Sequence, residues 1–229
     1  MNYLSHYHYN HAVCGRPALP YFVMGVALPD LWSRFSRRKR IRWKSVSAAT
    51  PRDPVGAPLR AGLLNHIEAD RWFHALPAFV RMQRSTRARV EMDSAGGGIS
   101  DLLAHLAVEL ALDHALLRRI PALADEFYDR LAECDSDEVA RSAGELGDVD
   151  TRGLDAVIDG FVSRRYLREY RRPDGLIEAM QLILSQTAFG GQVPRGWIER
   201  LVCEALRCAD PDEIWSQIPN REAIARQVR

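Results

Sequence analysis

The chain of 229 residues has no long apolar run, because its most apolar stretches, such as ALPYFVMGVALP, are interrupted by proline and glycine. A helix that spans a membrane needs roughly 20 consecutive apolar residues, so no span is expected. The start of the chain also lacks the basic segment and apolar stretch of a signal peptide. The cytoplasm is therefore the expected location.

Cysteine is scarce, and its spacing is uninformative. The four cysteines, Cys14, Cys134, Cys203 and Cys208, form no CxxC pair. This spacing argues against a disulfide framework and predicts thiols that are buried or chemically idle.

Net charge is nearly absent, since 31 Lys and Arg residues face 30 Asp and Glu residues, which leaves +1 at pH 7. Bulk charge thus gives no argument for a nucleic-acid partner. The sequence also contains no Walker or GxGxxG loop and no Ser-His-Asp or Cys-His signature.

What is present is a succession of helical patterns without a convincing series of alternating strands. Residues 60–80 have apolar positions at helical spacing, with Pro77 ending or kinking the segment. Ser100 is expected to cap the clearest helix, which Pro121 stops, after a flexible break at residues 96–98. Further helices are expected at 122–134, 153–171, 174–188, 195–208 and 211–217. Part of 135–150 is expected to be a loop, and 34–58 and 84–99 show no clear pattern. The sequence predicts one all-α domain over residues 1–229.

All seven histidines lie in the first half of the chain, at positions 6, 8, 11, 66, 74, 105 and 114. His66, Asp70 and His74 follow one another at four-residue steps, which places them on one stripe of a helix. The stripe predicts that their side chains lie close together.

The second helix repeats the spacing with His105, Glu109 and Asp113. Because this helix is otherwise rich in Leu and Ala, its polar stripe is expected to be buried. Buried imidazoles and carboxylates must be paired or must bind a metal, and this mixed set of donors suits Mn²⁺, Fe²⁺, Zn²⁺ or Mg²⁺. The alternative is ordinary pairing between residues one helical turn apart, with the histidines at the surface.

Asp30 follows an apolar stretch in YFVMGVALPDLWSRF, with Gly25 five residues earlier. It is a candidate ligand, although a helix N-cap before Leu31 is an equally good interpretation.

These motifs together resemble the acyl carrier protein phosphodiesterases, a family of distorted HD-type metal-dependent phosphohydrolases. The start MNYLSHYHYN resembles the family's MNFLAHLHLA, and GVALPD resembles its G-x-L-x-x-D segment with Asp30 as the aspartate. GLLNHIEAD matches the form G-x-x-x-H-x-x-x-D through Gly62, His66 and Asp70. HLAVELALDH departs from the family's DHF-type helix, and the resemblance covers roughly residues 1–120.

The resemblance implies an HD-like fold and hydrolysis of the phosphodiester that joins 4'-phosphopantetheine to a carrier-protein serine. The hypothesis places one or two divalent metals on residues before position 120, with Asp30 and Asp70 as catalytic residues. His8 and Asp113 are expected either as alternative ligands or as partners that orient the ligands. The proposed ligands are His6, Asp30, His66, Asp70, His105 and Glu109.

The densest basic run, RFSRRKRIRWK, contains Arg37, Arg38, Lys39 and Arg40. It is either a solvated loop or a docking surface for an anionic partner, and an acidic carrier protein agrees with the family resemblance. RRYLREYRR at 164–172 either extends this surface or pairs with nearby acidic residues.

Three classes of function remain open. The first is the metal-dependent phosphodiesterase, with a phospholipase C-like metallohydrolase as a variant. The second is a non-catalytic helical module that keeps a structural metal. The third, a nucleic-acid binder that uses the basic runs, is disfavoured by the near-neutral charge.

Overall fold

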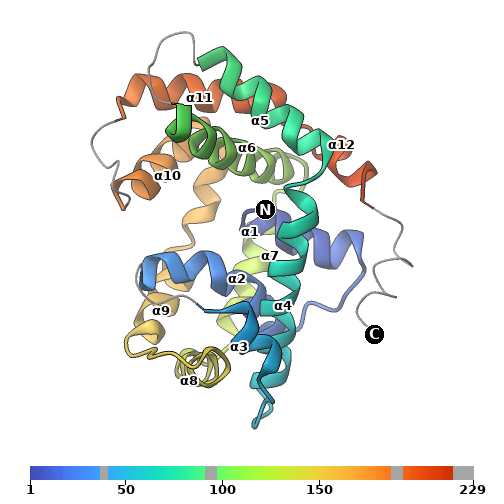
Figure 1. Ribbon diagram of the computed structural model, residues 1–229, viewed down its shortest axis with the longest axis vertical. Coiled ribbons are helices and arrows are strands. Elements are labelled where there is room, and N and C mark those ends of the chain that lie inside the picture. The colour runs from blue at the N-terminus through green and yellow to red at the C-terminus, as the bar shows by residue number, and fades with distance from the viewer. Residues whose placement is uncertain (37–40, 91–96, 187–192, 219–229) are drawn as a thin grey trace. The chain divides into compact units, whose positions relative to one another are not determined.

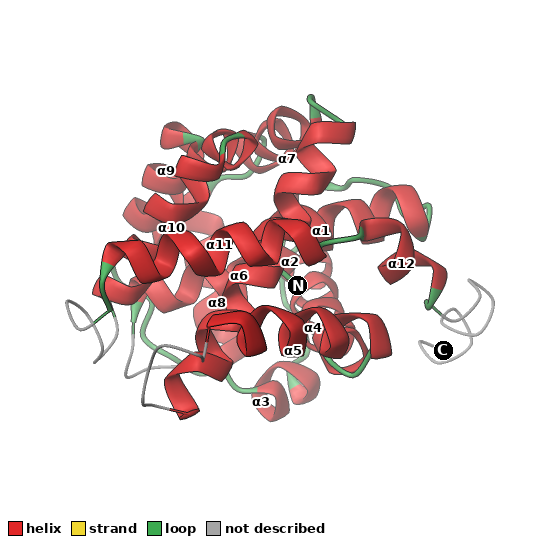
Figure 2. Cartoon of the chain, turned by 90° about the horizontal axis from the view of Figure 1, so that it is seen from above, coloured by secondary structure: helices red, strands yellow, loops and turns green. Residues whose placement is uncertain are grey.

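The computed structural model describes residues 1–36, 41–90, 97–186 and 193–218. Within these ranges the chain forms helices joined by loops and turns, and no strand occurs (Figures 1 and 2). The prediction of an all-α protein is confirmed. No helix in the described ranges is both long enough and apolar enough to cross a membrane.

The chain divides into two compact units. Unit 1 comprises residues 1–72 and 122–168, and unit 2 comprises residues 73–121 and 169–229. The prediction of one domain over residues 1–229 stays a prediction.

Unit 1 is built around helix α2, which packs against α1, α7 and α9, while α8 packs against α9 and α3. Its elements are α1 (Tyr3–His8), the π-helical turn η1 (Tyr9–Val13), α2 (Pro20–Phe35), α3 (Trp43–Ala48), α4 (Gly56–Phe73, whose last residue belongs to unit 2), α7 (Leu123–Ala132), α8 (Ser136–Gly147) and α9 (Leu154–Arg164).

In unit 2, helices α5, α6 and α11 run alongside one another (Figure 1), and α10 packs against both α6 and α11. Its elements are α5 (Pro77–Val90), α6 (Gly97–Arg119), the last residues of the 3₁₀ turn η3 (Tyr166–Arg171), α10 (Pro173–Ser185), α11 (Arg195–Cys208) and α12 (Pro211–Ser216).

The N-terminal tyrosines are core residues of unit 1. The ring centroid of Tyr3 lies 5.0 Å from that of Phe161, and that of Tyr7 lies 5.6 Å from that of Phe127. Aromatic side chains supply large apolar areas and prefer such tilted contacts. This packing fixes α1, and with it the position of His6.

Helices α2 and α4 approach each other closely at two glycines. A Cβ atom added at Gly25 would lie 2.2 Å from the carbonyl oxygen of Leu59, and one added at Gly62 would lie 2.2 Å from that of Phe22. Any larger residue at either position would force the two backbones apart. The glycines of both recognised motifs therefore have a packing role, which brings the following turns of α2 and α4 together.

Several expectations about helix ends are wrong. Asp30 lies inside α2, so it is not an N-cap. Helix α6 begins at Gly97, so Ser100 lies within it and residues 97–98 are helical. The cost of glycine in a helix is only about 1 kcal/mol, and packing against α5 and α11 can outweigh it.

The acidic stretch 135–150, which was expected to be partly loop, contains α8. The Asp135 side chain accepts a hydrogen bond from the Glu138 backbone N–H and caps the helix. Val139, Ala143 and Leu146 are buried on one face of α8. Pro77 does not kink a continuing helix, because α4 ends at Phe73 and Pro77 is the first residue of α5.

Candidate metal centre

Three helices of unit 1 bring two imidazoles and two carboxylates together. His6 comes from α1, Asp30 from α2, and His66 and Asp70 from α4. The Nε2 atom of His6 lies 3.2 Å from Asp70 Oδ1, and the Nε2 atom of His66 lies 3.3 Å from Asp70 Oδ2. The same His66 atom lies 3.8 Å from Asp30 Oδ1. Four of the six predicted ligands thus meet in one unit.

The local sequence explains this meeting. His66 lies one helical turn after Gly62, and Asp70 one turn after His66, so all three occupy the same side of α4. Because Gly62 contacts α2 directly, this side of α4 is the one that faces Asp30.

The imidazole of His66 is fixed in orientation and tautomer. Its Nδ1 atom lies 2.8 Å from the backbone oxygen of Val26 on α2. A carbonyl oxygen only accepts, so Nδ1 must donate and carry the proton. In the neutral ring, Nε2 then presents a lone pair toward Asp30 and Asp70. Histidines that bind metals are commonly oriented by such a bond from the other ring nitrogen.

His6 is the best evidence that these residues fit a metal. The side chain is 1% exposed, its Nδ1 atom has no hydrogen-bond partner, and its Nε2 atom lies 3.2 Å from Asp70 Oδ1. Burial, together with the nearby His66, lowers the pKa of His6 to about 3, so its imidazole is neutral. Its ring stacks on that of His66 with centroids 4.2 Å apart. A ring nitrogen that is buried without a partner loses its hydration and gains no hydrogen bond in return. A bound cation would compensate for this loss by accepting the lone pair of the imidazole.

The carboxylates carry the negative charge of the cluster. Burial raises the pKa of Asp70, but hydrogen bonds with His6 and His66 outweigh this effect and hold the pKa below its usual value. Burial lowers the pKa of His66, but the carboxylates of Asp30 and Asp70 raise it overall. Asp70 also accepts a hydrogen bond of 2.8 Å from the amino group of Met1.

The arrangement has a buried side and a solvent-facing side. His6 and His66 are 1% and 6% exposed, whereas Asp70 and Asp30 are 28% and 30% exposed. A ligand from solvent would therefore meet the carboxylates first. One donor atom each of His6, His66 and Asp70 lies within 4.8 Å of the others, which suits a single cation. Two nitrogen donors and one oxygen donor favour Zn²⁺, Fe²⁺ or Mn²⁺ over Mg²⁺.

The other two predicted ligands, His105 and Glu109, lie in unit 2, where they group with His74. The predicted contact between them is confirmed, because His105 Nε2 lies 3.3 Å from Glu109 Oε1. The predicted stripe of His66, Asp70 and His74 is wrong at His74, since α4 ends one residue before it. The proposed set of six ligands thus divides into two groups, all before residue 120.

The remaining candidates join neither group of potential ligands found in the described ranges. His8 is half-buried, and Asp113 is fully buried on α6. The Nδ1 atom of His11 lies 2.8 Å from the Arg16 backbone oxygen, and its ring packs on Tyr7.

The structure tests only one of the two basic runs. The docking residues Arg37, Arg38, Lys39 and Arg40 lie outside the described residues. In the second run, Arg165 and Arg168 pair with Asp129 and Asp125 of α7, and Arg172 pairs with Glu169. Pairing with acidic residues, one of the two interpretations of this run, is thereby confirmed for these three arginines.

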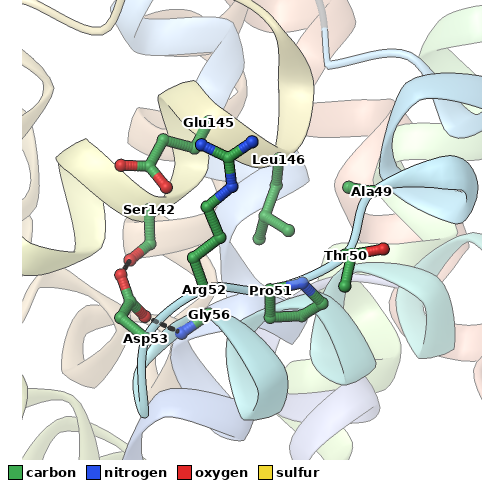
Figure 3. Close-up of a pocket in the computed structure, with 9 residues that line it drawn as sticks. All are labelled: Ala49, Thr50, Pro51, Arg52, Asp53, Gly56, Ser142, Glu145 and Leu146. Atoms are coloured by element: carbon green, nitrogen blue, oxygen red, sulfur yellow. Dashed lines mark hydrogen bonds between the residues drawn. The ribbon is translucent and has the colours of Figure 1, made fainter.

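Figure 3 shows a pocket of about 340 Å³ between the segment that precedes α4 and helix α8. One of its two carboxylates, Asp53, already accepts hydrogen bonds from the Gly56 backbone N–H and from Ser142 Oγ. The pocket also lacks any residue of the two metal-ligand groups. It is therefore a weaker candidate than the His and Asp cluster.

In comparisons with known proteins, no family model, no curated protein and no solved structure matches the chain. The family resemblance and its HD-like fold thus stay predictions.

Proposed function

We propose that the protein is a metal-dependent hydrolase of phosphodiesters whose centre is formed by His6, Asp30, His66 and Asp70. The observation that carries the proposal is the buried His6 imidazole, whose Nδ1 atom has no hydrogen-bond partner and whose Nε2 atom faces the Asp70 carboxylate beside a second, oriented imidazole.

A bound divalent cation would supply Lewis-acid chemistry, since it polarises a phosphoryl oxygen and makes water more acidic. His6, His66 and Asp70 would hold it. Asp30, which is 3.8 Å from His66 Nε2 and 30% exposed, accepts the proton of the attacking water in this proposal. The water oxygen bonds to phosphorus, the bond to the alcohol breaks, and the departing alcohol oxygen takes up a proton.

The specific substrate that we propose is the 4'-phosphopantetheine ester of an acyl carrier protein. It rests on the resemblance of MNYLSHYHYN, GVALPD and GLLNHIEAD to that family. The acidic carrier protein would dock on the basic run at 37–40.

A second candidate is a non-catalytic module in which the same residues form a structural site. The contact between the Met1 amino group and Asp70 favours it, because this contact already satisfies one carboxylate oxygen. The two candidates differ in turnover, which the following experiment measures.

The test combines elemental analysis of the purified chain with hydrolysis of bis(p-nitrophenyl) phosphate and of a holo acyl carrier protein. The variants His66→Ala and Asp70→Asn should lose the metal of this centre and lower hydrolysis by about 100-fold or more. Asp30→Asn should keep most of the metal but lose turnover, and removal of a catalytic proton acceptor commonly costs 10²–10⁴-fold.

His11→Ala is the matched control, because it removes a half-buried imidazole of the same unit that lies outside the centre. It should keep both metal and activity. Unchanged metal content in His66→Ala would refute the centre. Metal that is lost in His66→Ala, without turnover in the wild type, would establish the structural module instead.

A further inference from the structure

Unit 2 contains a second set of converging donor atoms. The Nε2 atom of His74 lies 2.9 Å from Glu109 Oε1, and that of His105 lies 3.3 Å from the same oxygen. One donor atom of each residue lies within 4.8 Å of the other two. Two imidazole nitrogens and a carboxylate oxygen are a known donor set for zinc, which leaves the fourth position of the ion to water.

The set joins two separate parts of unit 2. His74 lies in the turn between α4 and α5, whereas His105 and Glu109 lie one turn apart on α6. No sequence pattern connects His74 with α6, and only the packing of α5 on α6 brings them together.

Aromatic side chains hold the two imidazoles in place. The Phe79 ring centroid lies 5.3 Å from that of His74 and 5.0 Å from that of His105, and the imidazole centroids are 4.5 Å apart. A site whose ligands are fixed by packing loses little side-chain entropy when an ion binds.

Charge and access also suit a cation. The Glu109 side chain is 12% exposed, and the Nε2 atoms of both His74 and His105 lie within 3.3 Å of its Oε1 atom. This oxygen therefore lies in a largely dry place, where its attraction to a cation is strong. His74 and His105 are 33% and 26% exposed, which leaves a path for an ion from solvent.

We infer that His74 Nε2, His105 Nε2 and Glu109 Oε1 form a second, structural site for a divalent transition metal, with Zn²⁺ as the preferred ion. The ion links the turn before α5 to α6 and stabilises unit 2. The site takes no part in the hydrolysis proposed for unit 1, so the two proposals can fail independently.

The test uses the full chain, loaded with ZnCl₂ after chelator treatment, and measures bound zinc and thermal unfolding. The variant His66→Ala/Asp70→Asn removes the centre of unit 1 and should retain one equivalent of zinc that raises its Tm. Adding Glu109→Gln to this variant should abolish both the zinc and the Tm increase. Because glutamine keeps the size and one acceptor of glutamate, the fold itself should survive.

The exposed Asp101→Asn on the same helix α6 is the matched control, and in the same background it should leave zinc unchanged. Glu109→Gln alone should lose one equivalent of zinc but keep the hydrolysis of bis(p-nitrophenyl) phosphate. No zinc in His66→Ala/Asp70→Asn, or zinc that persists after Glu109→Gln is added, would overturn the second site. Loss of turnover in a stably folded Glu109→Gln alone would overturn its purely structural role.

Discussion

At the scale of single residues, Asp53 shows how one carboxylate connects separate elements. It accepts hydrogen bonds from the Gly56 backbone N–H at the start of α4 and from Arg141 and Ser142 of α8. The bond to the Gly56 N–H, followed by those to Arg141 and Ser142, lowers the pKa of Asp53 below its usual value of 3.8. The residue thus acts as a helix cap whose strength depends on its charge.

We expect Asp53→Asn to lower the free energy of unfolding by about 1 kcal/mol at pH 7, because asparagine keeps the acceptor oxygen but loses the charge that strengthens the hydrogen bonds with Gly56 and Arg141. Because the folded-state pKa is lowered, the stabilising effect is fully present above pH 3.8 and is lost as the pH falls through the folded-state pKa. Urea unfolding of both proteins across this pH range measures the difference, which should shrink in acid. The exposed Asp159→Asn should show no such pattern. A difference that stays constant down to pH 2 would contradict the charged cap.

At the scale of helices, the crossing of α2 and α4 brings together the residues of the metal centre that we propose for unit 1. The crossing depends on Gly25 and Gly62, since an added Cβ atom at either would lie 2.2 Å from a backbone oxygen of the other helix. Backbone atoms cannot rotate away as a side chain can. The helices would have to separate, and the ligands on them would separate as well.

We therefore expect Gly62→Ala to lower the free energy of unfolding by about 2–3 kcal/mol, within the usual range for overpacking. Metal affinity at His66 and Asp70 should fall with it. Urea unfolding measures the first effect, and calorimetric titration of the apoprotein with metal measures the second. Gly160→Ala in α9 is the control, because a Cβ atom there meets nothing within 4 Å. Alanine at that position should raise the free energy of unfolding by about 0.5–1 kcal/mol. Equal metal affinity in Gly62→Ala and wild type would contradict the role of the crossing.

At the scale of the whole molecule, each of the two units contains one group of potential metal ligands. A ligand that binds only the folded state stabilises it by about 2.7 kcal/mol when the free ligand concentration is 100 times the dissociation constant. For a chain of this size, such a gain corresponds to a Tm increase of roughly 5–10 °C.

The chelator removes both proposed ions, so the chelator-treated protein should unfold roughly 10–20 °C below the metal-loaded protein in differential scanning calorimetry. The double variant His66→Ala/Glu109→Gln should have the same Tm with and without metal. If this double variant responds to the chelator as strongly as the wild type, the ions act elsewhere on the chain.

The sequence by itself determined the all-α class, most helix positions and the proximity of His66 to Asp70, because one-turn spacing on a helix is a local property. It missed α8, since the tertiary burial of Val139, Ala143 and Leu146 outweighs the loop-like composition of that stretch. Only the tertiary structure decided which helices face each other. Residues far apart in sequence, such as His74 and Glu109, meet through packing, and periodicity along one helix contains no information about the partner across it.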